Sequence, residues 1–126
     1  MFQMHQKMLV VEDDETLRYL IVEAMSLLDL DVATCDCADE ALLLLQEDPS
    51  FALVLTDIRM PGLLDGWGLA NLICLRWPSL PVIVSSGHRR MHIWELPPNV
   101  YFLPKPWDLD AILGAVRYAL TPRHTR

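Results

Sequence analysis

The stretch Leu53-Val54-Leu55-Thr56-Asp57-Ile58-Arg59-Met60-Pro61-Gly62 is an apolar run that reaches one carboxylate and then breaks at a Pro-Gly pair. The apolar run begins at Phe51 and is short and continuous, which is typical of a strand buried on both faces of a sheet. Proline and glycine then end the regular element. An aspartate at such a boundary is most often a turn residue or a helix cap. The alternative, that Asp57 is a nucleophile, depends on which other residues reach the same place.

Strands and helices are predicted to alternate along the whole chain. Short apolar runs predict strands at 8–11, 31–35, 51–56, 80–85 and 100–103. Apolar residues spaced i, i+3, i+4 predict helices at 14–28, 40–47, 67–76 and 108–120. Residues 89–96 show little helical periodicity, so a helix between the last two strands is expected to be short or irregular. The alternation indicates an α/β fold with parallel strands and right-handed crossovers.

Length and charge narrow the class of protein. The 126 residues fit one domain, expected at 8–121, with an N-terminal extension at 1–7 and a tail at 122–126. The net charge of −7 disfavours direct binding to nucleic acid. No apolar run is long enough to span a bilayer and no signal peptide is visible, so a cytoplasmic protein without membrane contact is expected. The three cysteines predict no disulfide framework.

Polar residues follow several of the predicted strands. In an open parallel sheet, ligands bind beyond the carboxyl ends of the strands. The first strand ends at Glu12 and Asp13, the third at Asp57, the fourth at Ser86 and the fifth near Lys105. Crowded carboxylates repel one another unless a cation compensates, and an all-oxygen ligand set favours Mg²⁺. With a lysine and a hydroxyl beside them, these residues predict phosphoryl transfer to a carboxylate.

Four separated segments stand out together: Val10-Val11-Glu12-Asp13-Asp14, Thr56-Asp57-Ile58-Arg59-Met60-Pro61-Gly62, Val82-Ile83-Val84-Ser85-Ser86-Gly87 and Lys105-Pro106. In this order and spacing they resemble the receiver domain of two-component response regulators. The resemblance covers about residues 8–120. It implies a flavodoxin-like, doubly wound sheet of five parallel strands in the order 2-1-3-4-5 with five helices, the fourth short or irregular.

The resemblance also implies a role for each residue of the acidic group. Asp57 would be the phosphoacceptor. Asp13 would be the principal Mg²⁺ ligand, with Glu12 acting largely through water and Asp57 contributing an oxygen. The backbone carbonyl of Arg59 would complete the protein's share of the metal ligands.

Further roles fall on the later segments. Ser86 resembles the switch hydroxyl and Phe102 the switch aromatic, while Lys105 resembles the family's invariant lysine, joined to Pro106 by a cis bond. Ser85 competes with Ser86, which is favoured because the small Gly87 follows it. The residues that tune the lifetime of the acyl phosphate would be Arg59 and His88.

Two departures from the family pattern are visible. The loop between Asp57 and the Asp65-Gly66 pair is slightly longer than usual, which loops tolerate. The span from Ser86 to Lys105 is shorter than usual and contains Pro97-Pro98. This second departure again predicts a stunted fourth helix, and a changed surface where such domains usually dimerise.

Three functions compete. The first is a single-domain receiver that is phosphorylated by a histidine kinase or a histidine phosphotransfer protein. Such a receiver catalyses only its own phosphorylation and dephosphorylation. It signals by conformational change, protein contact or onward phosphotransfer. The second is a phosphohydrolase of the haloacid dehalogenase type, which needs a second acid where this chain has Arg59. The third is an interaction module with a receiver fold that works without phosphorylation.

Overall fold

Five parallel strands form one sheet in the computed structural model, which describes residues 5–60, 62–87 and 96–122. Their order is β2-β1-β3-β4-β5, as expected for the predicted flavodoxin-like topology. The strands are β1 (Lys7–Val11), β2 (Asp31–Cys35), β3 (Phe51–Asp57), β4 (Val82–Ser86) and β5 (Val100–Pro104).

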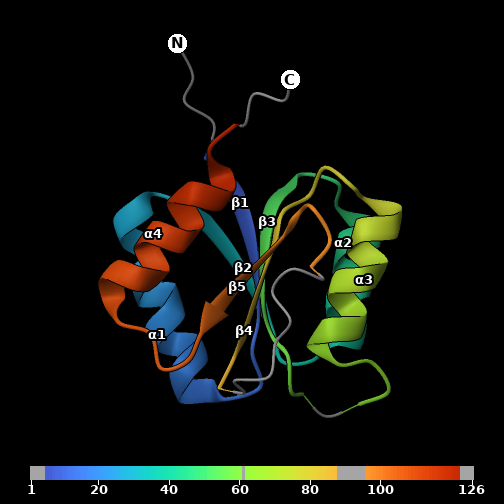
Figure 1. Cartoon of the computed structure of the whole chain (residues 1–126), viewed down its shortest axis with the longest axis horizontal. Coiled ribbons are helices and arrows are strands. Elements are labelled where there is room, and N and C mark those ends of the chain that lie inside the picture. Colours follow the sequence, from blue (N-terminus) through green and yellow to red (C-terminus); the bar gives the residue numbers. More distant parts are fainter. Residues whose placement is uncertain (1–4, 61, 88–95, 123–126) are drawn as a thin grey trace.

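Helices cover both faces of the sheet, which makes the fold doubly wound (Figure 1). The helices are α1 (Glu15–Met25), α2 (Ala38–Glu47), α3 (Gly66–Arg76) and α4 (Leu109–Leu120). Helices α1 and α4 lie against one face, and α2 and α3 against the other (Figure 1). Five helices were predicted, whereas the described ranges contain these four α-helices. The expected irregular helix falls on 88–95, which lies outside the described residues.

Aspartate side chains begin three of the helices. Asp14, Asp65 and Asp108 each accept a hydrogen bond from a backbone N–H three residues later, at 2.8–3.1 Å. Such caps satisfy an amide that the helix itself leaves unpaired. The helices predicted from 14 and from 108 therefore start one residue later, at Glu15 and Leu109, and Asp14 and Asp108 cap them.

The predicted first helix ends earlier than its apolar spacing suggested. Helix α1 stops at Met25, and the chain continues as a 3₁₀ turn (Ser26–Leu28). Asp29 then adopts a left-handed conformation with φ of 57°. Aspartate tolerates this region because its short side chain can bond locally. The tighter turn explains why the apolar stripe extended beyond the α-helix.

Alternation along the strands divides the core into two layers. In β1, Leu9 and Val11 pack on the side of α2 and α3, whereas Met8 and Val10 pack on the side of α1 and α4. All four side chains are at most 1% exposed. Because neighbouring side chains point to opposite faces, a strand covered on both sides is apolar throughout. In the described part of the chain, none of the helices combines the length and apolar character needed to cross a membrane.

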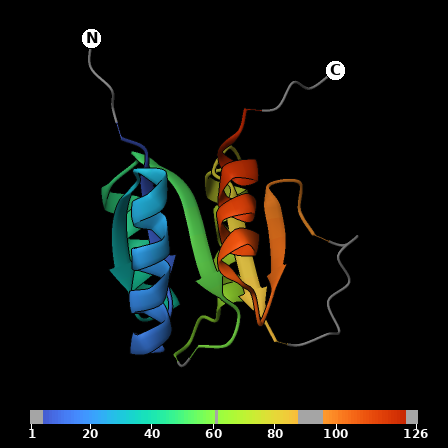
Figure 2. The same cartoon turned by 90° about the vertical axis from the view of Figure 1, so that its left-hand side faces the viewer.

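The register brings the ends of the central strands to one edge of the sheet. Val11 of β1 lies opposite Thr56 of β3, and Asp57 lies opposite Ser85 of β4. All strands point the same way, towards the lower edge in Figure 2. The residues that follow β1, β3, β4 and β5 therefore share that edge.

Candidate functional site

Three carboxylates meet at the carboxyl edge of the sheet. Glu12, Asp13 and Asp57 each offer an oxygen, and these atoms all lie within 4.8 Å of one another. Glu12 is only 3% exposed, Asp57 is half-buried and Asp13 is exposed. The convergence predicted from the strand ends is therefore present, with the acids supplied by the ends of β1 and β3.

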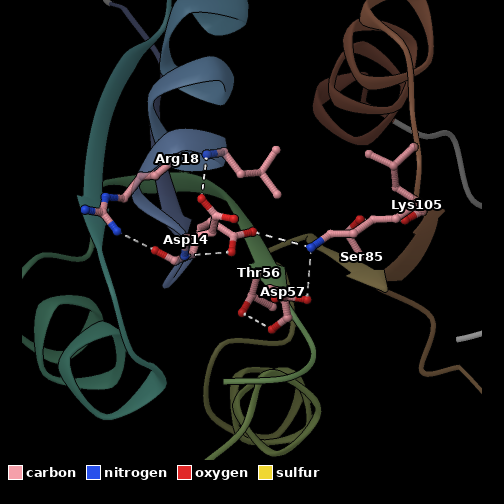
Figure 3. A network of polar contacts seen from close by, with 9 residues as sticks. Asp14, Arg18, Thr56, Asp57, Ser85 and Lys105 are labelled. Carbon is pink, nitrogen blue, oxygen red and sulfur yellow. Dashed lines mark hydrogen bonds and ion pairs between the residues drawn. The ribbon is translucent and has the colours of Figure 1, made fainter. Parts of the chain in front are cut away.

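Lys105 supplies positive charge to this acidic group. Its Nζ lies 3.4 Å from Asp57 Oδ1 and 3.6 Å from Glu12 Oε1. Figure 3 shows its side chain reaching across the edge of the sheet towards Asp57. Its peptide bond to Pro106 is cis, as the resemblance implied. One ammonium group thus partly neutralises carboxylates from two different strands.

Glu12 is the most deeply buried of the three acids. Burial raises the pKa of its carboxyl from 4.5 to about 6, and the charge of Asp57 adds to the rise. Two contacts act in the opposite direction and lower the pKa: the Asp14 N–H, which donates to Glu12 Oε2 at 3.1 Å, and the charge of Lys105. A carboxylate desolvated in this way gains from a further cation beside it.

The donor set fits a hard divalent cation. The three carboxylates offer oxygen only, and Mg²⁺ prefers a few carboxylates together with retained waters. The exposed Asp13 leaves room for such waters. Arg59, whose carbonyl was predicted as a ligand, follows Asp57 by two residues in the loop leaving β3, with an exposed side chain. The residues present therefore match Mg²⁺.

The two competing serines differ in their surroundings. Both are 4% exposed at the end of β4. The Ser85 hydroxyl donates to the Leu103 carbonyl of β5 at 2.7 Å, so it ties two strands together. Ser86 is the last residue of β4, one position nearer than Ser85 to the edge where the acids lie. Phe102 is half-buried in β5 and packs on the α2–α3 side of the sheet.

Two residues that support the site had not been anticipated from the sequence. Arg18 Nη1 donates to the Glu12 carbonyl at 2.7 Å, and Gly66 N–H donates to the Ile58 carbonyl at 2.9 Å. The sequence showed the Asp65-Gly66 pair only as the end of the loop that follows Asp57, without indicating the hydrogen bond to Ile58. Arg18 carried no signal beyond being a polar residue beside an apolar stripe. The predicted lifetime residue His88 lies outside the described residues.

An open, mostly apolar groove adjoins the acidic group. Its volume is about 600 Å³, and Lys105 forms part of its wall. Leu17 and Leu20 of α1 line one side, and Pro106 and Trp107 line the other. A partner that reached Asp57 from this direction would meet an apolar surface beside a charged centre.

The strand order and the acidic group at the carboxyl edge of the sheet define a receiver domain. Comparison with known proteins supports the same class. The model of the response regulator receiver domain matches residues 8–117. The chain therefore belongs to the response regulator receiver family.

The most similar proteins include transcriptional regulators. Response regulator protein FleR of Pseudomonas aeruginosa is 35% identical over 122 residues, which cover 93% of this chain and 25% of FleR. DNA-binding transcriptional regulator NtrC of Salmonella typhimurium is 33% identical over 118 residues, covering 89% and 24% respectively. The chain thus spans about a quarter of the length of the curated relatives it matches.

Solved structures show the same fold. A receiver domain from Clostridium thermocellum has a TM-score of 0.82 at 26% identity and covers 91% of this chain and 94% of that one. NtrX from Brucella abortus has a TM-score of 0.81 at 30% identity, covering 93% and 27%. Because NtrC is named as DNA-binding, the relatives lend no support to the expectation that nucleic acid is not a partner. That expectation rests on the charge of this chain alone.

Proposed function

We propose that the protein accepts a phosphoryl group from a phosphohistidine of a histidine kinase or histidine phosphotransfer protein onto Asp57. One observation carries the proposal. The oxygens of Glu12, Asp13 and Asp57 lie within 4.8 Å of one another, and Lys105 Nζ lies 3.4 Å from Asp57. A half-buried carboxylate flanked by a lysine and a cation site suits a nucleophile that must receive an anionic group.

The transfer is a single displacement at phosphorus. An Asp57 carboxylate oxygen forms the new P–O bond as the P–N bond to the donor imidazole breaks. The electron pair of that bond returns to the imidazole nitrogen, which takes up a proton. Lys105, already beside Asp57, would balance the charge on the transferred oxygens. The apolar groove that includes Trp107 supports a protein donor, which would bury this surface while presenting its histidine.

Glu12, Asp13 and Asp57, with the Arg59 carbonyl, would hold the Mg²⁺. When bound, Mg²⁺ supplies positive charge that shields the carboxylates and stabilises the transferring phosphoryl oxygens. The short distances among the three acids support this assignment. Glu12, being buried, would act largely through water, whereas the exposed Asp13 would contact the ion directly.

The signal would then pass through β4 and β5. Ser86 would donate to a phosphoryl oxygen, and Phe102, half-buried in the neighbouring strand, would change its packing. Arg59 and His88 would tune the lifetime of the acyl phosphate.

The protein would act on no substrate besides itself, and it would signal by conformational change or by onward phosphotransfer. It would work in the cytoplasm, where thiols such as its three free cysteines stay reduced.

Incubation with acetyl phosphate and Mg²⁺, followed by intact-protein mass spectrometry, tests the proposal. The wild-type protein is expected to gain the mass of one phosphoryl group, and Asp57→Asn is expected to gain none. Asp36→Asn, at an exposed aspartate beyond β2, is the matched control and should behave as wild type. No gain by the folded wild type would leave the third function, an interaction module independent of phosphorylation, as the better explanation.

A further inference from the structure

Arg18 ties the first turn of α1 back to the end of β1. Its Nη1 donates to the Glu12 carbonyl at 2.7 Å, and its own backbone N–H donates to the Asp14 carbonyl at 2.8 Å. The side chain is half-buried rather than extended into solvent. A guanidinium held against a single backbone carbonyl fixes that peptide more firmly than a neutral donor would.

Further hydrogen bonds restrain the same turn between β1 and α1. Glu12 N–H donates to the Cys35 carbonyl at 3.1 Å, and Glu12 Oε2 accepts from Asp14 N–H at 3.1 Å. The Asp14 side chain in turn caps α1 through Leu17 N–H. Asp13 sits in the middle of this network, so the direction of its carboxylate depends on the peptides on either side.

Glu12 is therefore held from two directions. Arg18 approaches on the opposite side of the turn from Lys105 (Figure 3). Lys105 interacts with the Glu12 carboxylate at 3.6 Å, whereas Arg18 binds the carbonyl. The lysine balances charge, and the arginine restrains the backbone.

We propose that Arg18 is a positioning residue for the cation site, fixing the Glu12 peptide so that the Asp13 carboxylate is directed towards Asp57. The inference rests on the proposed function, because it concerns how that site binds Mg²⁺. Without Arg18, the Glu12–Asp14 turn would sample more conformations, and binding a cation would have to order it. Partners that orient metal ligands typically change metal affinity by about 10- to 100-fold when removed.

The test compares Arg18→Met, which removes the donor, with Arg18→Lys, which keeps a charged donor. Arg117→Met is the matched control, because it makes the same change at an exposed position of α4. Mg²⁺ dissociation constants are measured by calorimetry. Amide hydrogen exchange at Asp14 is measured in the metal-free proteins, and urea unfolding identifies conditions in which every variant is folded.

Arg18→Met is expected to weaken Mg²⁺ binding by about tenfold or more and to speed exchange of the Asp14 amide. Arg18→Lys should lie between Arg18→Met and wild type, and Arg117→Met should match wild type. Wild-type affinity and wild-type Asp14 exchange in both Arg18 variants would overturn the inference. If the wild-type protein itself bound no Mg²⁺, the proposed function would fail, and this inference with it.

Discussion

Gly66 lies so close to Asp57 that a Cβ atom built on it would stand 1.8 Å from the Asp57 carbonyl oxygen. The same atom would lie 2.9 Å from the Cα of Ile58. The contact is with backbone, which cannot move aside like a flexible side chain. Gly66 is thus required for the first turn of α3 to pack against the peptide of Asp57, the proposed phosphoacceptor.

Gly66→Ala is therefore expected to displace Asp57. The overpacking should lower the free energy of unfolding by about 1–3 kcal/mol. A shift of the Asp57 carboxylate should also slow its phosphorylation by acetyl phosphate, on the order of a hundredfold for a displacement of about 1 Å. Urea unfolding and the rate of phosphoryl incorporation measure the two effects.

Gly114→Ala provides the control, because nothing lies within 4 Å of a Cβ built at that position in α4. Replacing a helical glycine with alanine should raise stability by up to about 1 kcal/mol and leave the phosphorylation rate unchanged. Equal phosphorylation rates for Gly66→Ala and wild type would show that the close approach does not position Asp57.

Glu12 should make the metal-free protein sensitive to pH. Its pKa is about 6 in the folded protein against 4.5 ordinarily, so the folded state holds this proton more tightly than the unfolded chain. The contribution of this group to the free energy of unfolding therefore falls as pH rises from about 4.5 to about 6 and stays low above that range. Glu12→Gln is expected to remove this fall.

The measurement is urea unfolding with a chelator present, at several pH values across that range. The stability of Glu12→Gln relative to wild type should rise through the window. Glu23→Gln, at an exposed glutamate on α1, is the matched control for the substitution itself. A constant difference between Glu12→Gln and wild type would contradict the assigned pKa.

Lys105→Met should leave the acids without their balancing charge. Because Lys105 lowers the pKa of Glu12, its removal should raise that pKa further, which carboxyl NMR titration would detect. Phosphorylation of Asp57 should slow on the order of a hundredfold, as when a preorganised donor is removed. Lys7→Met is the control: this lysine pairs with Asp48 away from the site, so stability should fall while the phosphorylation rate holds. A faster reaction in Lys105→Met would refute the assigned role.

Alanine substitutions at the two serines that end β4 should have different effects on stability and on the response to phosphorylation. Ser85→Ala removes the bond to the buried Leu103 carbonyl and should cost about 1–3 kcal/mol of stability. It should leave the response to phosphorylation intact. Ser86→Ala should still be phosphorylated on Asp57 but lose the phosphorylation-dependent NMR shift changes in β5. If Ser85→Ala lost those changes instead, the switch role would belong to Ser85.

The sequence predicted most of the sheet and the main acids for the same reason. Strands buried on both faces are continuous apolar runs, so the residues that end them are easy to locate. Parallel alternation then places those ends on one edge, which is why Glu12, Asp13 and Asp57 could be grouped before their distances were known. Helix starts were less certain, because a cap such as Asp14 belongs to neither the strand nor the helix.

Other features could not be predicted, because they depend on which backbone groups come into contact in the folded protein. Arg18 binds a backbone carbonyl, and any residue at position 12 would present one. Position 66 requires glycine because it packs against the Asp57 peptide, nine positions earlier in the chain. No pattern in the sequence around Gly66 indicates that contact. The 3₁₀ turn after Met25 keeps the apolar spacing of a helix, so periodicity alone could not place the end of α1.

Phosphorylation at Asp57 is tested most directly by locating the phosphoryl group within the chain. Protein treated with acetyl phosphate and Mg²⁺ is reduced with borohydride, which converts an aspartyl phosphate to homoserine, and its peptides are sequenced by mass spectrometry. Homoserine is expected at position 57 and at no other aspartate. Homoserine at Asp13 or elsewhere, with position 57 unchanged, would contradict this expectation.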